Sequence, residues 1–151
     1  MDAKLIEHMM NPKNYGRLEN PDAEGIGKNP ENGEKVAISI RVGKDEKNPY
    51  IEDIRFQAIG CTTTVVAGSM LTEESKGLNL NGVKNLVEAT MKLLDSLPPE
   101  DAACSEMVAL AIKAAVDTYE KRKDIADYPV ITYKVSNSCV VKDENIQKEG
   151  K

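Results

Sequence analysis

Two neighbouring segments alternate apolar and polar positions in the way that half-buried strands do. In residues 35–42 the apolar side chains fall on one side: Val36, Ile38, Ile40 and Val42. Residues 50–59 repeat the alternation, with these residues on the apolar side: Ile54, Phe56 and Ala58. Because a polar loop at 43–49 separates the two segments, they predict an antiparallel pair of strands.

The N-terminal third is less regular. Residues 2–10 place apolar side chains on one side of a short predicted helix, which Asn11-Pro12 ends. We expect His8, the only histidine, to be exposed on this helix. Residues 11–32 are rich in Asn, Pro and Gly and predict an extended surface connection that holds a short edge strand around 23–27.

Beyond residue 61 the apolar period becomes helical and predicts helices at about 62–76, 81–95 and 103–123. In the first of them one side is formed by Val65, Val66, Met70 and Leu71. In the last, apolar positions recur every three or four residues: Cys104, Met107, Val108, Ala111, Ala115 and Tyr119. Residues 129–135 could add one more strand.

The pattern predicts an α+β fold in which a small antiparallel sheet of about three strands packs against a layer of helices. Residues 1–125 form the expected domain. Residues 126–151 are expected to be a C-terminal extension that holds the extra strand and then a loose tail.

Composition narrows the classes of function. The chain has 151 residues, a net charge of −5 and only 4% aromatic residues, so we expect no nucleic-acid binding, which needs clustered basic or stacking side chains. It has no apolar run long enough for a membrane span and no signal-peptide pattern, and we therefore expect a cytoplasmic protein without a membrane partner. Its 3 cysteines would be largely reduced in that compartment.

Two of the cysteines are placed where chemistry is favoured. Cys61 follows Gly60 at the end of a predicted strand and precedes a helical pattern, and Cys104 opens the last helical pattern. Free backbone N–H groups and the helix dipole at a helix start stabilise a thiolate, which is the form that binds metals and attacks sulfur. A single intracellular cysteine is more often a small buried side chain. Two cysteines in matched settings favour a shared site.

The chain resembles the IscU/NifU N-terminal family of iron–sulfur cluster assembly scaffolds over roughly residues 3–123. The resemblance rests on these motifs in order: Asn11-Pro12-Lys13-Asn14-Tyr15-Gly16, Asn32-Gly33-Glu34, Ile51-Glu52-Asp53-Ile54-Arg55-Phe56, Gly60-Cys61, Leu97-Pro98-Pro99, Cys104-Ser105 and Ala111-Ile112-Lys113-Ala114-Ala115. It implies a scaffold or carrier rather than an enzyme. Members of the family assemble a two-iron two-sulfur (2Fe–2S) cluster with sulfur from a cysteine desulfurase and pass it to acceptor apo-proteins, often with chaperones.

This sequence departs from the family at several ligand positions. Members usually hold three cysteines, an Asp two residues after the first, and a Lys and a His just before the third. Here Asn32 stands at the first cysteine position, Glu34 at that of the Asp, and Asp101 and Ala103 at those of the Lys and the His. The resemblance therefore implies a cluster held by Cys61 and Cys104, with Glu34 and Asp101 as candidate oxygen ligands for iron.

Three arrangements could complete the ligand set. Two chains could each supply Cys61 and Cys104 at a symmetric homodimer interface, and this is the arrangement that we favour from sequence. Cys139, in the C-terminal extension, could fold back as a third ligand. Alternatively, Asn32 and Glu34 could replace the missing ligands weakly and leave a labile cluster.

Other functions use the same residues. Cys61 could accept a persulfide or form a redox couple with Cys104. The chain could also be a paralogue that binds assembly partners without the chemistry. Zinc is expected only as an adventitious occupant of a pocket that cysteines line.

Overall fold

The computed structural model of the protein describes residues 3–30, 33–43, 48–60, 62–96 and 99–135. The elements follow one another as α1 (Ala3–Met10), β1 (Ala23–Lys28), β2 (Lys35–Gly43), β3 (Tyr50–Ile59), α2 (Thr62–Ser75), α3 (Leu80–Leu93), the short 3₁₀ helix η1 (Leu94–Ser96), α4 (Pro99–Arg122) and β4 (Ile131–Lys134).

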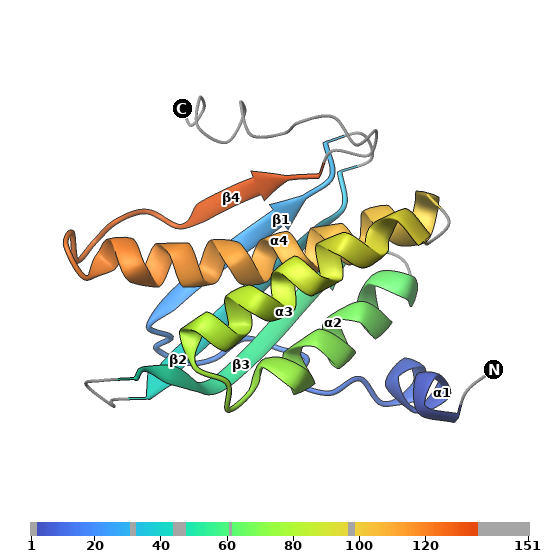
Figure 1. The fold of residues 1–151 in the computed structure, drawn as a ribbon, viewed down its shortest axis with the longest axis horizontal. Coiled ribbons are helices and arrows are strands. Elements are labelled where there is room, and N and C mark those ends of the chain that lie inside the picture. Colours follow the sequence, from blue (N-terminus) through green and yellow to red (C-terminus); the bar gives the residue numbers. More distant parts are fainter. Residues whose placement is uncertain (1–2, 31–32, 44–47, 61, 97–98, 136–151) are drawn as a thin grey trace.

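The strands form one sheet in the order β3-β2-β1-β4 (Figure 1). β1, β2 and β3 are antiparallel neighbours, and β4 lies parallel to β1. The predicted α+β class is confirmed, and the predicted strand within 129–135 is present as β4. The expectation that 23–27 would be an edge strand is wrong, because β4 returns from the far end of the sequence and covers the second edge of β1.

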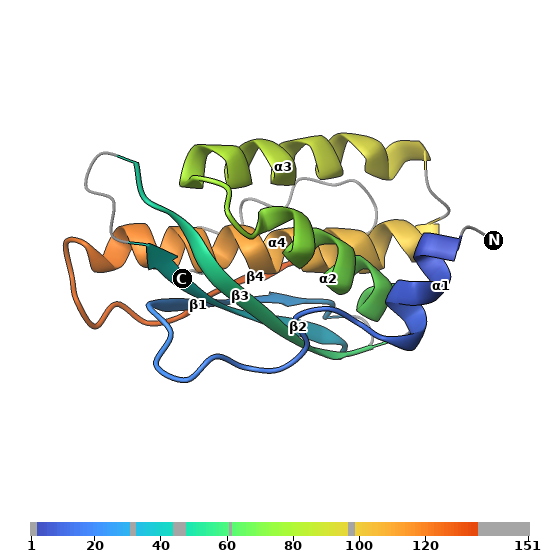
Figure 2. The ribbon, with the colours of Figure 1, turned by 90° about the horizontal axis from the view of Figure 1, so that it is seen from below.

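The molecule is layered. α2 and α4 lie on one face of the sheet, and α3 lies outside them, on the side away from the strands (Figure 2). The apolar sides predicted for the two hairpin strands point into the interface between sheet and helices, where Val36, Ile38, Ile40, Ile54 and Phe56 have no exposed surface. The alternation of apolar residues therefore gave the orientation of this hairpin correctly.

The close approach of α4 to the sheet depends on glycines in β1. A Cβ atom at Gly25 would lie 2.1 Å from the backbone nitrogen of Ala115, and one at Gly27 would lie 2.1 Å from the carbonyl oxygen of Met107. Both contacts are with backbone atoms, which cannot move aside as a flexible side chain can. Glycine in β1 and small residues in α4 thus set how closely the helix lies over the strand.

The buried side of α2 differs from the one that the apolar pattern suggested. Its fully buried side chains are hydroxyls: Thr64, Ser69, Thr72 and Ser75. Thr72 Oγ1 donates to the carbonyl oxygen of Gly68 at 2.7 Å, so this buried hydroxyl is satisfied within the helix. A Cβ atom at Gly68 would lie 2.5 Å from the ring of Phe56. Because this side packs so closely on β3, it takes small residues, while Val65 and Leu71 lie only partly buried beside it.

The ends of α2 and α3 follow local backbone chemistry. Gly77 adopts φ +89° just beyond the end of α2, a conformation that favours glycine at a helix C-terminus. Asn79 caps α3, and its side-chain oxygen accepts the backbone N–H of Gly82 at 2.6 Å.

Among the described residues, no helix combines the length and the continuous apolar character that crossing a membrane requires.

The N-terminal helix packs against α2 through a histidine that is buried rather than exposed. His8 is 3% exposed, and its Nδ1 lies 2.6 Å from Ser69 Oγ. The backbone N–H of Lys13 donates to the same oxygen at 2.7 Å, and His8 Nε2 lies 3.5 Å from a carboxylate oxygen of Glu73. The expected exposure of His8 is therefore wrong, because Ser69 and Glu73 on α2 give the buried ring polar partners.

Candidate functional site

Three strand ends meet at one end of the sheet. Lys28, the last residue of β1, pairs with Lys35 at the start of β2, which in turn pairs with Ile59 at the end of β3. The connection between β1 and β2 and the residues that follow β3 therefore emerge together. We call this end of the sheet, defined by Lys28, Lys35 and Ile59, the site end; α2 and α4 begin on the same side of the molecule (Figure 1).

Glu34 lies next to the residue that precedes Cys61. A Cβ atom at Gly60 would lie 3.5 Å from the carboxyl carbon of Glu34 and 3.0 Å from Thr64 Oγ1. Glu34 is half-buried, and its backbone oxygen accepts the N–H of Asn29 at 2.8 Å. The structure thus brings this carboxylate to the entrance of α2, beside position 60.

α2 begins at Thr62, so the predicted change from strand to helix around position 61 is confirmed. Cys61 itself lies outside the described residues, as do Asn32 and Cys139. Asp101 belongs to the first turn of α4, and the description of that residue extends only to its backbone.

Cys104 does not stand at a helix start. α4 begins at Pro99, so Cys104 lies in the second turn, beyond the first backbone N–H groups that have no helical partner. The expectation of a thiol at the first position of this helix is therefore wrong. A proline suits the first helical position because its φ is already helical and it has no N–H to satisfy, and this signal in Pro99 would have placed the start correctly.

The direction of α4 nevertheless takes Cys104 to the site end. Ala111 and Ala115 lie over Gly25, and Met107 lies over Gly27, so α4 runs antiparallel to β1. Cys104 comes one helical turn before Met107, in the direction in which β1 ends. Its side chain is 7% exposed and lies on the packed side of the helix, as the three-and-four spacing predicted. Glu34, Gly60 and Cys104 therefore belong to the same end of the molecule.

The described residues alone do not make a complete metal site. Among them, no cluster of three or more His, Cys, Asp or Glu side chains is arranged to hold a metal ion. Candidate ligands at positions 32, 61 and 139 and the carboxylate of Asp101 are outside that description.

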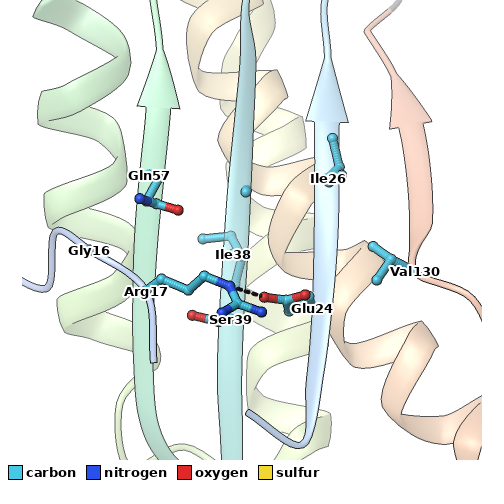
Figure 3. Close-up of a pocket in the computed structure, with 9 residues that line it drawn as sticks. Gly16, Arg17, Glu24, Ile26, Ile38, Ser39, Gln57 and Val130 are labelled. Carbon is cyan, nitrogen blue, oxygen red and sulfur yellow. Dashed lines mark hydrogen bonds and ion pairs between the residues drawn. The ribbon is translucent and has the colours of Figure 1, made fainter. Parts of the chain in front are cut away.

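A separate hollow lies on the opposite face of the sheet, away from the helices. It has a volume of about 230 Å³, and Arg17 Nε donates to Glu24 Oε2 at 2.7 Å across it (Figure 3). Its described lining residues include neither a thiol nor an imidazole: Gly16, Arg17, Glu24, Ile26, Ala37, Ile38, Ser39, Gln57 and Val130. This hollow lacks the soft ligands that iron–sulfur chemistry uses.

A polar contact between β4 and α4 is one that the sequence pattern does not predict. The hydroxyl of Tyr133 on β4 donates to Asp117 Oδ2 at 2.5 Å, and Lys113 Nζ lies 4.9 Å from the centre of the Tyr133 ring. Burial and the hydrogen bond to the Asp117 carboxylate raise the pKa of Tyr133 well above its ordinary value. The spacing of Lys113 and Asp117 on α4 gives no sign of a partner on a distant strand.

The chain is similar to known proteins in sequence and in fold. Two scaffold proteins for iron–sulfur cluster assembly are similar to this chain: IscU 1 of Archaeoglobus fulgidus, 34% identical over 82% of this chain and 79% of its own length, and IscU of Rickettsia prowazekii, 32% identical over 80% and 92%. Among solved structures, the N-terminal part of a NifU-like protein from Brucella abortus shares the fold, with a TM-score of 0.52 at 14% identity over 84% of this chain and 90% of that one.

A further solved structure, a candidate scaffold for the SUF system from Fervidobacterium islandicum, has a TM-score of 0.65 at 15% identity and covers 77% of this chain and 96% of its own. At these identities the two solved structures bear on the fold alone. The family model described as the NifU-like N terminal domain matches residues 1–126. This match and the similarity to the two IscU proteins establish that the chain belongs to the NifU-like N-terminal domain family.

Proposed function

We propose that this protein is a scaffold for iron–sulfur cluster assembly that carries a 2Fe–2S cluster through Cys61 and Cys104. The observation that supports it best is the convergence at the site end, where Gly60 precedes Cys61 and α4 brings in Cys104. Cysteine thiolates are the usual ligands of such clusters. The similar IscU proteins are named as scaffolds for iron–sulfur cluster assembly. The cluster is cargo that such a protein receives and passes on.

The remaining candidate ligands of the cluster are weaker than thiolates. Glu34 stands beside Gly60 and would offer an oxygen ligand near Cys61. Asp101, in the first turn of α4, occupies a position where the helix dipole favours an acidic side chain, and it is the second candidate oxygen ligand. Asn32 would contribute at most a weak amide oxygen. Such ligands bind iron less firmly than thiolates do, which suits release to an acceptor.

The proposal implies partners and conditions. A cysteine desulfurase would supply the sulfur, acceptor apo-proteins would take the cluster, and chaperones could assist the release. A reducing compartment such as the cytoplasm would keep the thiols available. A homodimer that shares one cluster between two pairs of Cys61 and Cys104 is one form of the holo-protein, and zinc from a buffer could occupy the same thiols adventitiously.

The deciding experiment is anaerobic reconstitution of the full chain with ferrous iron and sulfide, followed by absorption spectra and iron and sulfide counts. We expect a cluster in the wild type and its loss in Cys61→Ala and in Cys104→Ala. Ser105→Ala, which changes the neighbour of Cys104 and leaves both thiols in place, is the matched control and should retain the cluster.

Either of two results would reject the proposal: no cluster in the wild type, or a cluster that survives both cysteine substitutions. Incubation with a cysteine desulfurase and mass spectrometry addresses the other reading of the same thiols. A persulfide on Cys61 in protein that takes up no iron would indicate a sulfur acceptor instead.

A further inference from the structure

Three lysines form a row across the sheet at the site end. Lys35 on β2 pairs with Lys28 on β1, and Lys28 pairs with Lys134 on β4. Paired residues point to the same face of a sheet, and successive residues of a strand point to opposite faces. The residue next to each lysine faces the helices: Val36, Gly27 and Tyr133. The three lysines therefore lie on the face away from the helices, which we call the open face, and all three are exposed.

The row concentrates positive charge in a chain whose net charge is −5. Among the described residues, none of these lysines forms an ion pair. Like charges on directly opposite residues destabilise a sheet. A lysine on an edge strand can protect that edge from further pairing, but this applies only to Lys134, because Lys28 and Lys35 lie on the inner strands β1 and β2. Negative charge from outside would relieve the repulsion.

An apolar surface adjoins the lysine row on the open face. Two residues back along their strands from Lys28 and Lys35, or about 7 Å, Ile26 and Ala37 form a pair that lines the hollow of about 230 Å³ (Figure 3). Ile59, which pairs with Lys35, is 62% exposed at the end of the same row. Positive charge and apolar contact area are thus side by side.

We propose that the lysine row and the hollow dock an acidic segment of a partner protein. Carboxylates of the segment pair with the ammonium groups, and an apolar side chain enters the hollow as an anchor. The net negative charge of the chain opposes a nucleic-acid backbone, which also has no apolar side chain for Ile26 and Ala37 to contact. Such a partner would be held beside the cluster site.

The inference rests on the proposed function only for the role of the partner. Docking is measured on the metal-free chain, and cluster formation on the reconstituted one. A lysine variant that forms a normal cluster and fails to dock the segment would support the docking surface. Docking by a chain that forms no cluster would reject the proposed function and leave the surface standing.

An NMR titration of the metal-free, isotopically labelled chain with a short synthetic peptide of Glu and Leu tests the docking. We expect the amide signals of Lys28, Lys35 and Lys134 to shift and those of α3 to stay. Replacing all three lysines by Gln should weaken binding at least about fivefold, which three surface ion pairs supply. Lys92→Gln with Lys121→Gln and Lys123→Gln makes the same charge change on exposed positions beside the helices. This control should bind within about twofold of the wild type, because salt screens distant charges.

The hollow has its own variant. Ala37→Gln places a longer polar side chain there and should weaken binding of the peptide about threefold or more. A matching peptide with Gln for every Glu should lose most of its affinity and its dependence on salt. Four results would overturn the proposal: no shift in the wild type, shifts centred on the helices, equal binding by the lysine variant and its control, or tighter binding of a single-stranded oligonucleotide of the same charge. Circular dichroism verifies that each variant is folded.

Discussion

Gly27 in β1 and Met107 in α4 are in such close contact that a Cβ atom at Gly27 would lie 2.1 Å from the Met107 carbonyl oxygen. The contact holds the N-terminal half of α4 against the strand that ends at the site end. Cys104, one turn from Met107, thereby has a position relative to the sheet that backbone atoms determine.

Gly27→Ala should consequently destabilise the protein by more than the roughly 1–3 kcal/mol that is usual for an overpacked core, because the atoms that the new Cβ would meet belong to the backbone of α4. Urea unfolding followed by circular dichroism measures this loss. Lys28→Ala, an exposed change on the same strand, should stay within about 0.5 kcal/mol of the wild type. Equal stability of the two variants would show that α4 can shift away from β1 without cost.

Ser69→Ala should loosen α1. The change leaves the buried His8 Nδ1 and the partly buried N–H of Lys13 without the oxygen that they share. A polar group that is buried without a partner costs about 1–3 kcal/mol. Hydrogen exchange should become faster in Ala3–Met10 and stay unchanged in α4. Glu74→Ala, an exposed substitution on the same helix, is the control. Protection of α1 that survives Ser69→Ala would mean that its apolar contacts alone hold the helix.

Tyr133 predicts a loss of stability at alkaline pH. Its pKa in the folded protein is raised, first by burial and then by Asp117, above an ordinary value of about 10, so the fold favours the neutral phenol. That stabilisation is complete below about pH 10 and is lost as the pH rises further. Tyr133→Phe should reduce this alkaline fall in the free energy of unfolding and cost about 0.5–1.5 kcal/mol at neutral pH.

Chemical denaturation at a series of pH values measures both effects. Tyr15→Phe, which alters a hydroxyl on a half-exposed ring, should leave the alkaline slope as it is. The account of Tyr133 would be wrong if both variants kept the full slope.

Cys104 should react slowly with alkylating agents in the native apo-protein. It is 7% exposed on the packed side of α4, so iodoacetamide reaches it through local opening. We expect Cys104 to be labelled at least about tenfold more slowly in the native protein than in urea. Mass spectrometry of the peptide that contains Cys104 measures the labelling. Native labelling as fast as in urea would show that α4 leaves the sulfur accessible.

The strands and helices whose pattern is local could be predicted from sequence. Val36 to Val42 alternate because one side of β2 faces helices and the other does not, and the same holds for Ile54 and Phe56. The three-and-four spacing around Met107 likewise identified the packed side of α4. These features need no knowledge of distant parts of the chain.

Features that depend on distant partners could not be predicted. The central place of β1 requires β4, which lies about a hundred residues later in the chain. The burial of His8 requires Ser69, whose hydroxyl gives no apolar signal. The start of α4 is an exception, because Pro99 carried the information locally.

The candidate site divides in the same way. Cys61 and Cys104 could be chosen from their motifs, and the neighbourhood of Glu34 and Gly60 depends on the register of β2 and β3. Sequence alone favoured a second copy of the chain as the source of further ligands.

The parallel pairing of β4 with β1 has a consequence for biosynthesis. While the ribosome is still making the C-terminal residues, β1 can pair with β2 but has an open edge on its other side, ready to join a strand of another nascent chain. β4 can cover this edge only after all of α4 has been made. Chains that stop before Ile131 would therefore be prone to aggregate, and coexpressed holdase chaperones should keep such truncated products soluble.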